Sequence, residues 1–181
     1  KLIAEGKIKK QKPLPPITDD EIPYELPQGW EWARLGEITN YGASNKVEPD
    51  NVKDDELWVL ELEDIEKITS ILLKKVRYKN RPFKSTKNVF LAGDVLYGKL
   101  RPYLDKVLVA DEDGICSTEI LPLRCEIINP YYLRYSLKGK DFLEYVDSVV
   151  YGMKMPRLGT KDGQVALIPI PPFTEQKRIV A

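Results

Sequence analysis

The chain has 181 residues, of which 43% are hydrophobic and 31% are charged, and its 28 basic and 28 acidic residues give a formal net charge of zero. A chain of this length typically forms one domain, and no apolar run approaches the roughly 18 residues that a membrane-spanning helix needs. With two cysteines and no histidine, the chain excludes a disulfide scaffold, a Ser-His-Asp triad, a Cys-His dyad and a histidine-ligated zinc site.

The charges are distributed unevenly along the chain. Residues 13–66 carry three basic and fifteen acidic residues, whereas residues 67–110 carry eleven basic and two acidic residues. Such asymmetry indicates a polar partner, and a basic segment of this kind suits DNA phosphates. The alternative is that the two segments face each other and neutralise each other.

The start of the chain is predicted to lie outside the globular body. Residues 1–12 have the pattern of a helix tail, with Gly6 as its C-terminal cap, and the missing initiator methionine suggests a piece of a longer protein. Five prolines follow between residues 13 and 29. Because proline restricts both itself and the preceding residue to extended conformations, we expect a linker that lies over the domain and becomes ordered near Tyr24.

The globular body begins at Trp30. Alternating or β-branched apolar residues predict short strands, separated by polar loops over residues 39–50 and 151–163. The predicted strands cover residues 57–62, 75–78, 94–97, 106–110, 115–123 and 165–170, and residues 30–35 suit either a half-buried strand or a short turn of helix.

Helices are predicted only near the C-terminal end of the body. Asn129 is a good N-cap and Pro130 a good first helical residue, and apolar residues then recur at helical spacing to Val149, with an interruption at Gly139. Thr174 is expected to cap a further helix over residues 175–181. The sequence therefore predicts an α+β domain dominated by short strands.

No catalytic or metal-binding cluster is convincing. Asn129–Tyr132 resembles the Asn-Pro-Pro-Tyr/Phe motif of amino-methyltransferases, but the second proline and a glycine-rich cofactor loop are missing. Cys116 and Cys125 are expected to be buried structural thiols. A metal-dependent nuclease could use a pattern of three acidic residues and a lysine, as in Asp50, Glu61, Glu63 and Lys67. In so acidic a region this spacing is better explained by chance. We predict no catalytic residue, no metal and no cofactor.

Three loops combine cations with aromatic and polar groups, which are the tools of phosphate contact and base readout. They cover residues 41–46, 99–103 and 154–161, and we expect them to converge on one face. The alternatives are ordinary surface loops, or arginines 101 and 157 paired with acids of residues 13–66. The candidate DNA-binding residues are Tyr41, Ser44, Asn45, Lys46, Lys84, Lys87, Lys99, Arg101, Tyr103, Lys154, Arg157 and Lys161.

Four stretches, in order, resemble the specificity subunits of type I restriction-modification enzymes. The first runs from Glu21 to Ile38 and includes Leu26-Pro27-Gln28-Gly29-Trp30. The others are Leu96-Tyr97-Gly98-Lys99-Leu100-Arg101-Pro102-Tyr103-Leu104, Asp113-Gly114-Ile115-Cys116-Ser117-Thr118-Glu119, and Ile168-Pro169-Ile170-Pro171-Pro172-Phe173-Thr174-Glu175-Gln176-Lys177-Arg178-Ile179. The resemblance extends over the whole chain.

The resemblance implies a target-recognition domain with a small, mostly antiparallel, partly barrel-like sheet plus helices. It divides the chain into a helical spacer tail (1–12), a proline-rich linker (13–23), the recognition domain (24–170) and the start of a conserved coiled-coil helix (171–181). A full subunit in this family has two such domains, each reading one half of a split sequence in double-stranded DNA.

The same resemblance implies a non-catalytic cytoplasmic protein of a bacterium or archaeon. Methyltransferase subunits would dock on its helices and, through them, restriction subunits would join the complex. Two alternatives stay open: the specificity region of a single-chain restriction-methyltransferase, and a protein-interaction module with no DNA role.

Overall fold

The computed structural model describes residues 13–181. The helix tail predicted for residues 1–12 lies outside the described residues. The described strands are β1 (Glu31–Arg34), β2 (Lys46–Val47), β3 (Trp58–Leu60), β4 (Val76–Arg77), β5 (Lys87–Phe90), β6 (Val95–Gly98), β7 (Val107–Val109), β8 (Gly114–Cys116), β9 (Ile120–Leu123) and β10 (Leu167–Ile170).

Helices are concentrated in the C-terminal part. The α-helices are α1 (Leu35–Ile38), α2 (Pro130–Leu137), α3 (Lys140–Val150), α4 (Thr160–Val165) and α5 (Phe173–Ile179). Short 3₁₀ turns connect many of the strands: η1 (Asp19–Glu21), η2 (Pro49–Asn51), η3 (Leu62–Asp64), η4 (Tyr78–Asn80) and η5 (Pro102–Leu104).

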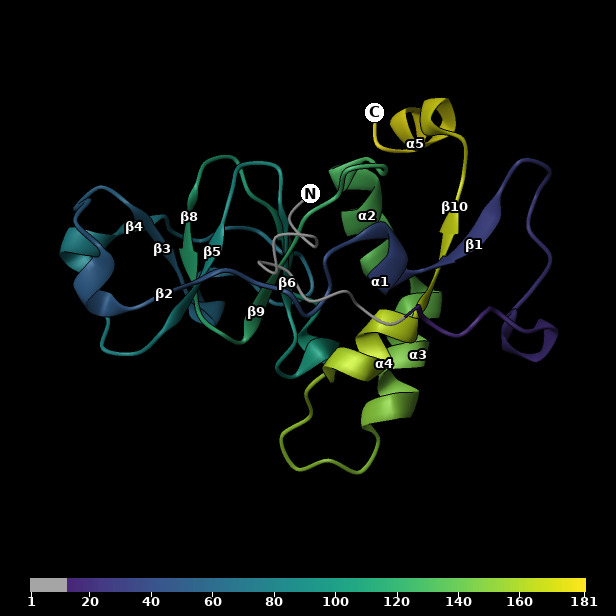
Figure 1. The fold of residues 1–181 in the computed structure, drawn as a ribbon, viewed down its shortest axis with the longest axis horizontal. Coiled ribbons are helices and arrows are strands. Elements are labelled where there is room, and N and C mark those ends of the chain that lie inside the picture. Colours follow the sequence, from purple (N-terminus) through teal and green to yellow (C-terminus); the bar gives the residue numbers. More distant parts are fainter. Residues whose placement is uncertain (1–12) are drawn as a thin grey trace.

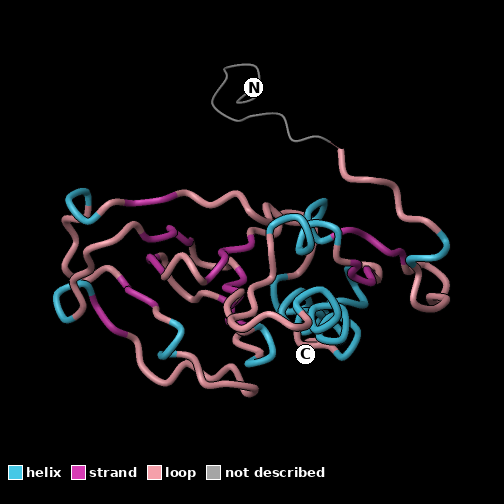
Figure 2. Tube along the Cα trace, turned by 90° about the horizontal axis from the view of Figure 1, so that it is seen from below, coloured by secondary structure: helices cyan, strands magenta, loops and turns pink. Residues whose placement is uncertain are grey.

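The molecule is elongated, with strands at one end and helices at the other. Strands β2, β3, β4, β5 and β8 form the end on the left of Figure 1, and β1, β10 and the α-helices lie on the right. Seen from below in Figure 2, the α-helices again gather in one region, while the opposite end consists of strands, loops and short turns. Strands β6 and β9 lie between the two ends (Figure 1).

The strands form three sheets. Their orders are β1-β10, β2-β5-β8-β3-β4 and β7-β6-β9, and the paired strands run antiparallel except for β3 with β8. None of these sheets closes into a barrel within residues 13–181. The predicted α+β class with mostly antiparallel pairing is confirmed, while the barrel-like character is not seen in these sheets.

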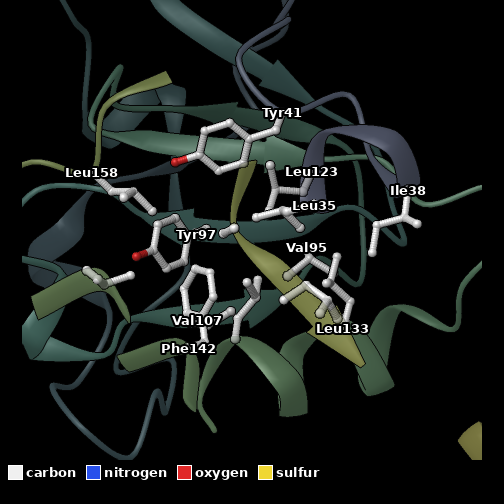
Figure 3. Close-up of a cluster of buried hydrophobic side chains, with 14 of the residues drawn as sticks. Leu35, Ile38, Tyr41, Val95, Tyr97, Val107, Leu123, Leu133, Phe142 and Leu158 are labelled. Carbon is white, nitrogen blue, oxygen red and sulfur yellow. The ribbon is translucent and has the colours of Figure 1, made fainter. Parts of the chain in front are cut away.

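Strand β6 separates two hydrophobic clusters, and its four residues are all buried. Because side chains alternate across a strand, Val95 and Tyr97 face one hydrophobic cluster while Leu96 faces another. The first cluster fills the space between the three-stranded sheet and helices α1 to α4, where Tyr97 meets Phe142 edge-to-face at 5.8 Å between ring centroids (Figure 3). The second cluster joins this sheet to the five-stranded one through residues such as Trp58.

One predicted strand is in fact two. The sequence predicts one continuous strand over residues 115–123, but the backbone N–H of Ile120 donates to the carbonyl of Ser117 at 2.9 Å and turns the chain. Strand β8 therefore joins the five-stranded sheet and β9 the three-stranded sheet. The single-strand prediction was wrong because both halves are apolar, and a turn between sheets leaves little trace in hydrophobic periodicity.

Strand β5 is missing from the predictions because it begins with two polar residues. Both are buried with partners: the Lys87 ammonium forms an ion pair with Glu61, and the Asn88 amide donates to the carbonyl of Ile120 at 2.9 Å. The predicted polar loop over residues 151–163 likewise ends in α4, which was not expected.

The helix boundaries follow their local signals closely at one site and less so at another. The Asn129 side chain accepts bonds from the N–H groups of Tyr131 and Tyr132, and Gly139 separates α2 from α3, as predicted. Helix α5 begins at Phe173, so Thr174 is not its N-cap. The carbonyl of Pro172 accepts the first helical bonds instead, from the N–H groups of Glu175 and Gln176 at 2.8 and 3.0 Å.

The proline-rich arm is held against the body by one arginine. Arg34 is 1% exposed, and its guanidinium donates to the carbonyls of Pro15, Pro16 and Val165 at 2.7, 3.0 and 2.8 Å. It also forms an ion pair with Glu21 at 2.8 Å. The arm is extended, as its prolines predict, and it contacts the domain earlier in the chain than the expected Tyr24.

Candidate nucleic-acid interface

Two of the three predicted loops lie side by side. Leu100 and Arg157 form an isolated antiparallel bridge. The N–H of Arg101 donates to the carbonyl of Pro156 at 2.8 Å, and the N–H of Leu158 donates to the carbonyl of Lys99 at 3.1 Å. The cationic segments 99–103 and 154–158 are therefore fixed to each other through their backbones.

The third loop reaches the other end of the same segment. The side-chain amide of Gln164, in α4, donates to the carbonyl of Tyr41 at 3.0 Å. Gly42 has a φ of +85° and packs so closely that a Cβ there would lie 2.4 Å from the Thr160 methyl carbon. Residues 41 and 42 thus contact α4, which follows the extended loop below α3 in Figure 1.

Tyr41 is a core residue and is unavailable to DNA in this structure. Its side chain is 1% exposed and points into the main hydrophobic cluster, close to Tyr97 and Leu158 (Figure 3). Burial raises the pKa of its hydroxyl, which has no hydrogen-bond partner among residues 13–181. The ring fits into the core because Gly163 has no Cβ; a Cβ there would lie 2.0 Å from the Tyr41 Cζ. A residue buried in this way does not support the predicted DNA contact.

Lys87 is also withdrawn from the surface. Only 10% of its side chain is exposed, and its ammonium is paired with Glu61 and lies 5.7 Å from the ring centroid of Phe83. The half-buried Ser44 donates its hydroxyl to the Asn88 side chain at 3.0 Å and so connects its loop to β5. Lys84, on the loop before β5, is exposed.

Arg157 is exposed but is not a free cation. Its Nε donates to both carboxylate oxygens of Glu119 at 3.1 Å, and 43% of its side chain is exposed. The acid belongs to the turn between β8 and β9, and therefore not to residues 13–66. The remaining exposed candidates are Asn45, Lys46, Arg101, Tyr103, Lys154 and Lys161, and Lys99 is half-buried.

The acidic and basic segments neutralise each other in part, as the alternative proposed. Basic residues from 67–110 form ion pairs with acids of 13–66 in four cases: Lys74 with Glu63 and Asp64, Lys79 with Glu56, Arg81 with Glu63 and Asp64, and Lys87 with Glu61. Lys75 and Arg77 pair with Asp111 or Glu112.

Some basic side chains of residues 67–110 remain without an ion pair in the described part of the chain. Within residues 67–110, the basic side chains that form no ion pair with a described residue are Lys67, Lys84, Lys99, Arg101 and Lys106. Lys106 donates to the carbonyl of Leu62 at 2.7 Å, so its ammonium is already bound. Three of the other four were predicted as DNA contacts, and Lys67 was not among the predicted residues.

The most deeply buried of the carboxylates in these ion pairs, Asp64, has a structural role. The Asp64 side chain is fully buried, accepts two bonds from Arg81, and also accepts the N–H of Glu61 at 2.9 Å. Burial alone would raise the pKa of the Asp64 carboxyl, but these hydrogen bonds and the nearby charges of Arg81 and Lys74 hold that pKa below its usual value. This pair fixes η3 to the loop after η4.

The described residues contain no group of three or more side chains suited to hold a metal ion. Cys116 is buried, and burial raises the pKa of its thiol and raises that of Cys125 to about 12, so neither is a thiolate at neutral pH. No helix within residues 13–181 is long and apolar enough to cross a membrane.

Comparison with curated proteins finds relatives along nearly the whole chain. It is 32% identical over 194 residues to the specificity subunit of the type I restriction enzyme EcoAI from Escherichia coli, covering 99% of this chain and 31% of the relative. It is 27% identical over 167 residues to the EcoDI specificity subunit of the same species, covering 92% of this chain and 36% of the relative. The EcoEI specificity subunit is 53% identical over 60 residues, which cover 32% of this chain and 10% of the relative.

Solved structures agree with these sequence matches. The crystal structure of the HsdS subunit from Thermoanaerobacter tengcongensis matches with a TM-score of 0.73 and 26% identity, covering 87% of this chain and 42% of that one. A structure described as showing complex assembly and conformational transition of the type I R-M system matches with the same values. A scan against models of protein families finds no match.

The chain spans about a third of the length of the EcoAI and EcoDI subunits. The three curated relatives are specificity subunits, and the Thermoanaerobacter tengcongensis structure is an HsdS subunit. The chain is a homologue of the specificity subunits of type I restriction enzymes and corresponds in extent to one target-recognition domain of such a subunit.

Proposed function

We propose that this chain binds duplex DNA and reads one half of a split target sequence, as the target-recognition part of a type I restriction-modification specificity subunit. The observation that carries the proposal is the likeness to the EcoAI specificity subunit over 99% of the chain, in a fold shared with a solved specificity subunit at a TM-score of 0.73. Residues 24–170 would form the recognition domain, within a protein that acts in the cytoplasm.

The DNA-facing surface in this proposal is built on the joined segments 99–103 and 154–161. Lys99, Lys154 and Lys161 form no ion pair with a described residue, so their charges are available for phosphates. Arg101 and Tyr103 are exposed on the same segment pair, where a planar guanidinium and an aromatic ring can contact base edges. Asn45, Lys46 and Lys84 would extend this surface toward β5.

The chemistry would come from partners. The proposed division of labour gives sequence recognition to this chain and methyl transfer to methyltransferase subunits, with restriction subunits joining through them. Residues 171–181, which contain α5, would begin the helix on which a methyltransferase docks.

The test is to delete the gene of the intact protein in its source organism and to map methylated bases across the genome. One methylated motif in two short parts should disappear and return on complementation. Unchanged methylation would contradict the proposal. In parallel, methyl transfer by the purified intact protein without a partner would favour a single-chain enzyme, and absence of DNA binding with every methyltransferase partner would favour a protein-interaction module.

A further inference from the structure

Two neighbouring turns have backbone conformations that ordinary residues avoid. Within residues 13–181, the non-glycine residues with positive φ are Ile68 at 69°, Ser70 at 57°, Arg101 at 48° and Asp105 at 49°. A β-branched residue such as Ile68 is especially unfavourable in this left-handed region. Such conformations persist where the surroundings fix them, and they concentrate at functional sites.

The two turns, 67–70 and 101–105, are bonded to each other. The N–H of Ile68 donates to the carbonyl of Leu104 at 2.8 Å, and the Ser70 hydroxyl donates to the carbonyl of Asp105 at 2.7 Å. The strained residues of both turns therefore belong to one unit, which we call the double turn.

Lys138, at the C-terminal end of α2, joins both halves of the double turn. Its ammonium donates to the carbonyl of Ile68 at 2.7 Å, to the Ser70 hydroxyl at 3.0 Å and to the Asp105 carboxylate. The Lys138 and Asp105 side chains are only 19% and 12% exposed. Burial raises the pKa of the Asp105 carboxyl, whose Oδ1 has no hydrogen-bond partner among the described residues, so this carboxylate depends on Lys138 for compensation.

The double turn presents two large hydrophobic side chains that are mostly exposed. Ile68 is 65% exposed and Tyr103 is 52% exposed. Lys67 and Arg101 flank them without an ion pair to any residue in 13–181. A strained backbone that carries an isoleucine into solvent costs stability and brings no packing in return, which points to a partner that covers it.

We propose that the double turn is a preorganised DNA-contacting element, that Ile68 and Tyr103 contact base edges or sugars in a groove, and that Lys138 is its positioning residue. The proposal rests on the function proposed above. Apolar side chains read the thymine methyl group or wedge between base steps, and the flanking cations match the charge of the backbone. In this proposal Lys138 does not touch the DNA; its ammonium holds Ile68, Ser70 and Asp105 in place and so fixes the double turn that carries Arg101 and Tyr103.

The test compares three variants of the intact protein in its methyltransferase complex: Ile68→Asn, Lys138→Met and the control Lys140→Met. Lys140 lies two residues further on, is 82% exposed and forms an exposed ion pair with Glu144. Affinity for a duplex carrying the motif mapped in the source genome is measured against a scrambled duplex, with the thermal midpoint recorded for each variant.

Asparagine tolerates the left-handed conformation, so Ile68→Asn should keep or raise the thermal midpoint while the affinity ratio falls about tenfold. Lys138→Met should lower the ratio by at least as much, and Lys140→Met should leave it unchanged. A stable Ile68→Asn complex with an unchanged ratio would overturn the proposal, as would a Lys138→Met complex that loses stability but keeps full discrimination. If the unaltered complex fails to distinguish the two duplexes, the proposed function itself fails.

Discussion

The guanidinium of Arg157 is locked against the carboxylate of Glu119, with Nε 3.1 Å from both oxygens. Arg157 also forms a backbone bridge with Leu100, so this residue joins the 154–158 segment to the 99–103 segment through its backbone and to the turn between β8 and β9 through its side chain. An arginine held in one orientation at the surface is a good base reader, because less freedom is lost on binding. The same pair would also serve as a structural clamp.

Substitution separates these two roles of Arg157. Arg157→Ala should relax specificity at one position of the DNA target and cost about 1–3 kcal/mol of specific binding. The measurement is affinity of the methyltransferase complex for a set of single-base variants of the mapped motif. Loss of folding stability with unchanged discrimination would show that Arg157 only clamps the two segments together, and Glu119→Gln serves as the companion variant that frees the guanidinium.

Lys99 should behave differently, since a lysine that contacts phosphate has no information about base sequence. Lys99→Ala should weaken binding to all duplexes alike and reduce the slope of log affinity against log salt concentration by about 1. Titrations at several salt concentrations measure this slope. A change in base preference with an unaltered slope would remove Lys99 from the phosphate-contacting set.

The buried pair of Asp64 and Arg81 should dominate the stability of the five-stranded end. Asp64→Ala leaves the Arg81 guanidinium with only the exposed Glu63 carboxylate and should cost about 3–5 kcal/mol of unfolding free energy, measured by urea denaturation. Lys79→Ala, which breaks the exposed pair with Glu56, is the control and should cost about 1 kcal/mol or less.

The Asp64 carboxylate should make the folding stability depend on pH. The pKa of Asp64 is lower in the folded protein than in an unfolded chain. Its contribution to stability is therefore fully present above the unfolded pKa of about 4 and is lost as the pH falls through the lower folded value. Asp64→Asn should flatten the acid limb of the stability curve. An acid limb of unchanged steepness would indicate that other carboxylates control it.

The close contact between the Tyr41 ring and Gly163 can be tested by substitution at either residue. Tyr41→Phe removes a buried hydroxyl that has no partner among the described residues, so unfolding free energy should stay equal or rise by about 1 kcal/mol, with DNA discrimination unchanged. Gly163→Ala places a methyl group 2.0 Å from the Tyr41 ring and should destabilise the domain by about 1–3 kcal/mol. Reduced DNA discrimination in a stable Tyr41→Phe protein would return Tyr41 to the interface.

Much of the fold follows from local signals. Asn129 caps α2 and Gly139 ends it, because capping and helix interruption depend on residues within one turn. The division of residues 115–123 between two sheets was not predictable in this way. Strand β8 pairs with β3 and β5, whereas β9 pairs with β6, and only these partners distinguish the two strands.

The candidate interface shows the same limit more sharply. Lys87 has the composition of a surface lysine, and its burial depends on Glu61, 26 positions earlier in the chain. The 99–103 and 154–161 segments resemble each other in composition, but that likeness does not indicate that they pair. The double turn left no sequence signal, because the unusual φ of Ile68 is imposed by Leu104 and Lys138 from distant parts of the chain.

The most direct test of the central claim is a transplant of residues 24–170 into the EcoAI specificity subunit, in place of the segment to which they align, followed by mapping of the bases that the assembled enzyme methylates. We expect one half of the methylated EcoAI sequence to change to a new sequence while the other half is retained. An assembled chimera that methylates the original EcoAI sequence in both halves would contradict it.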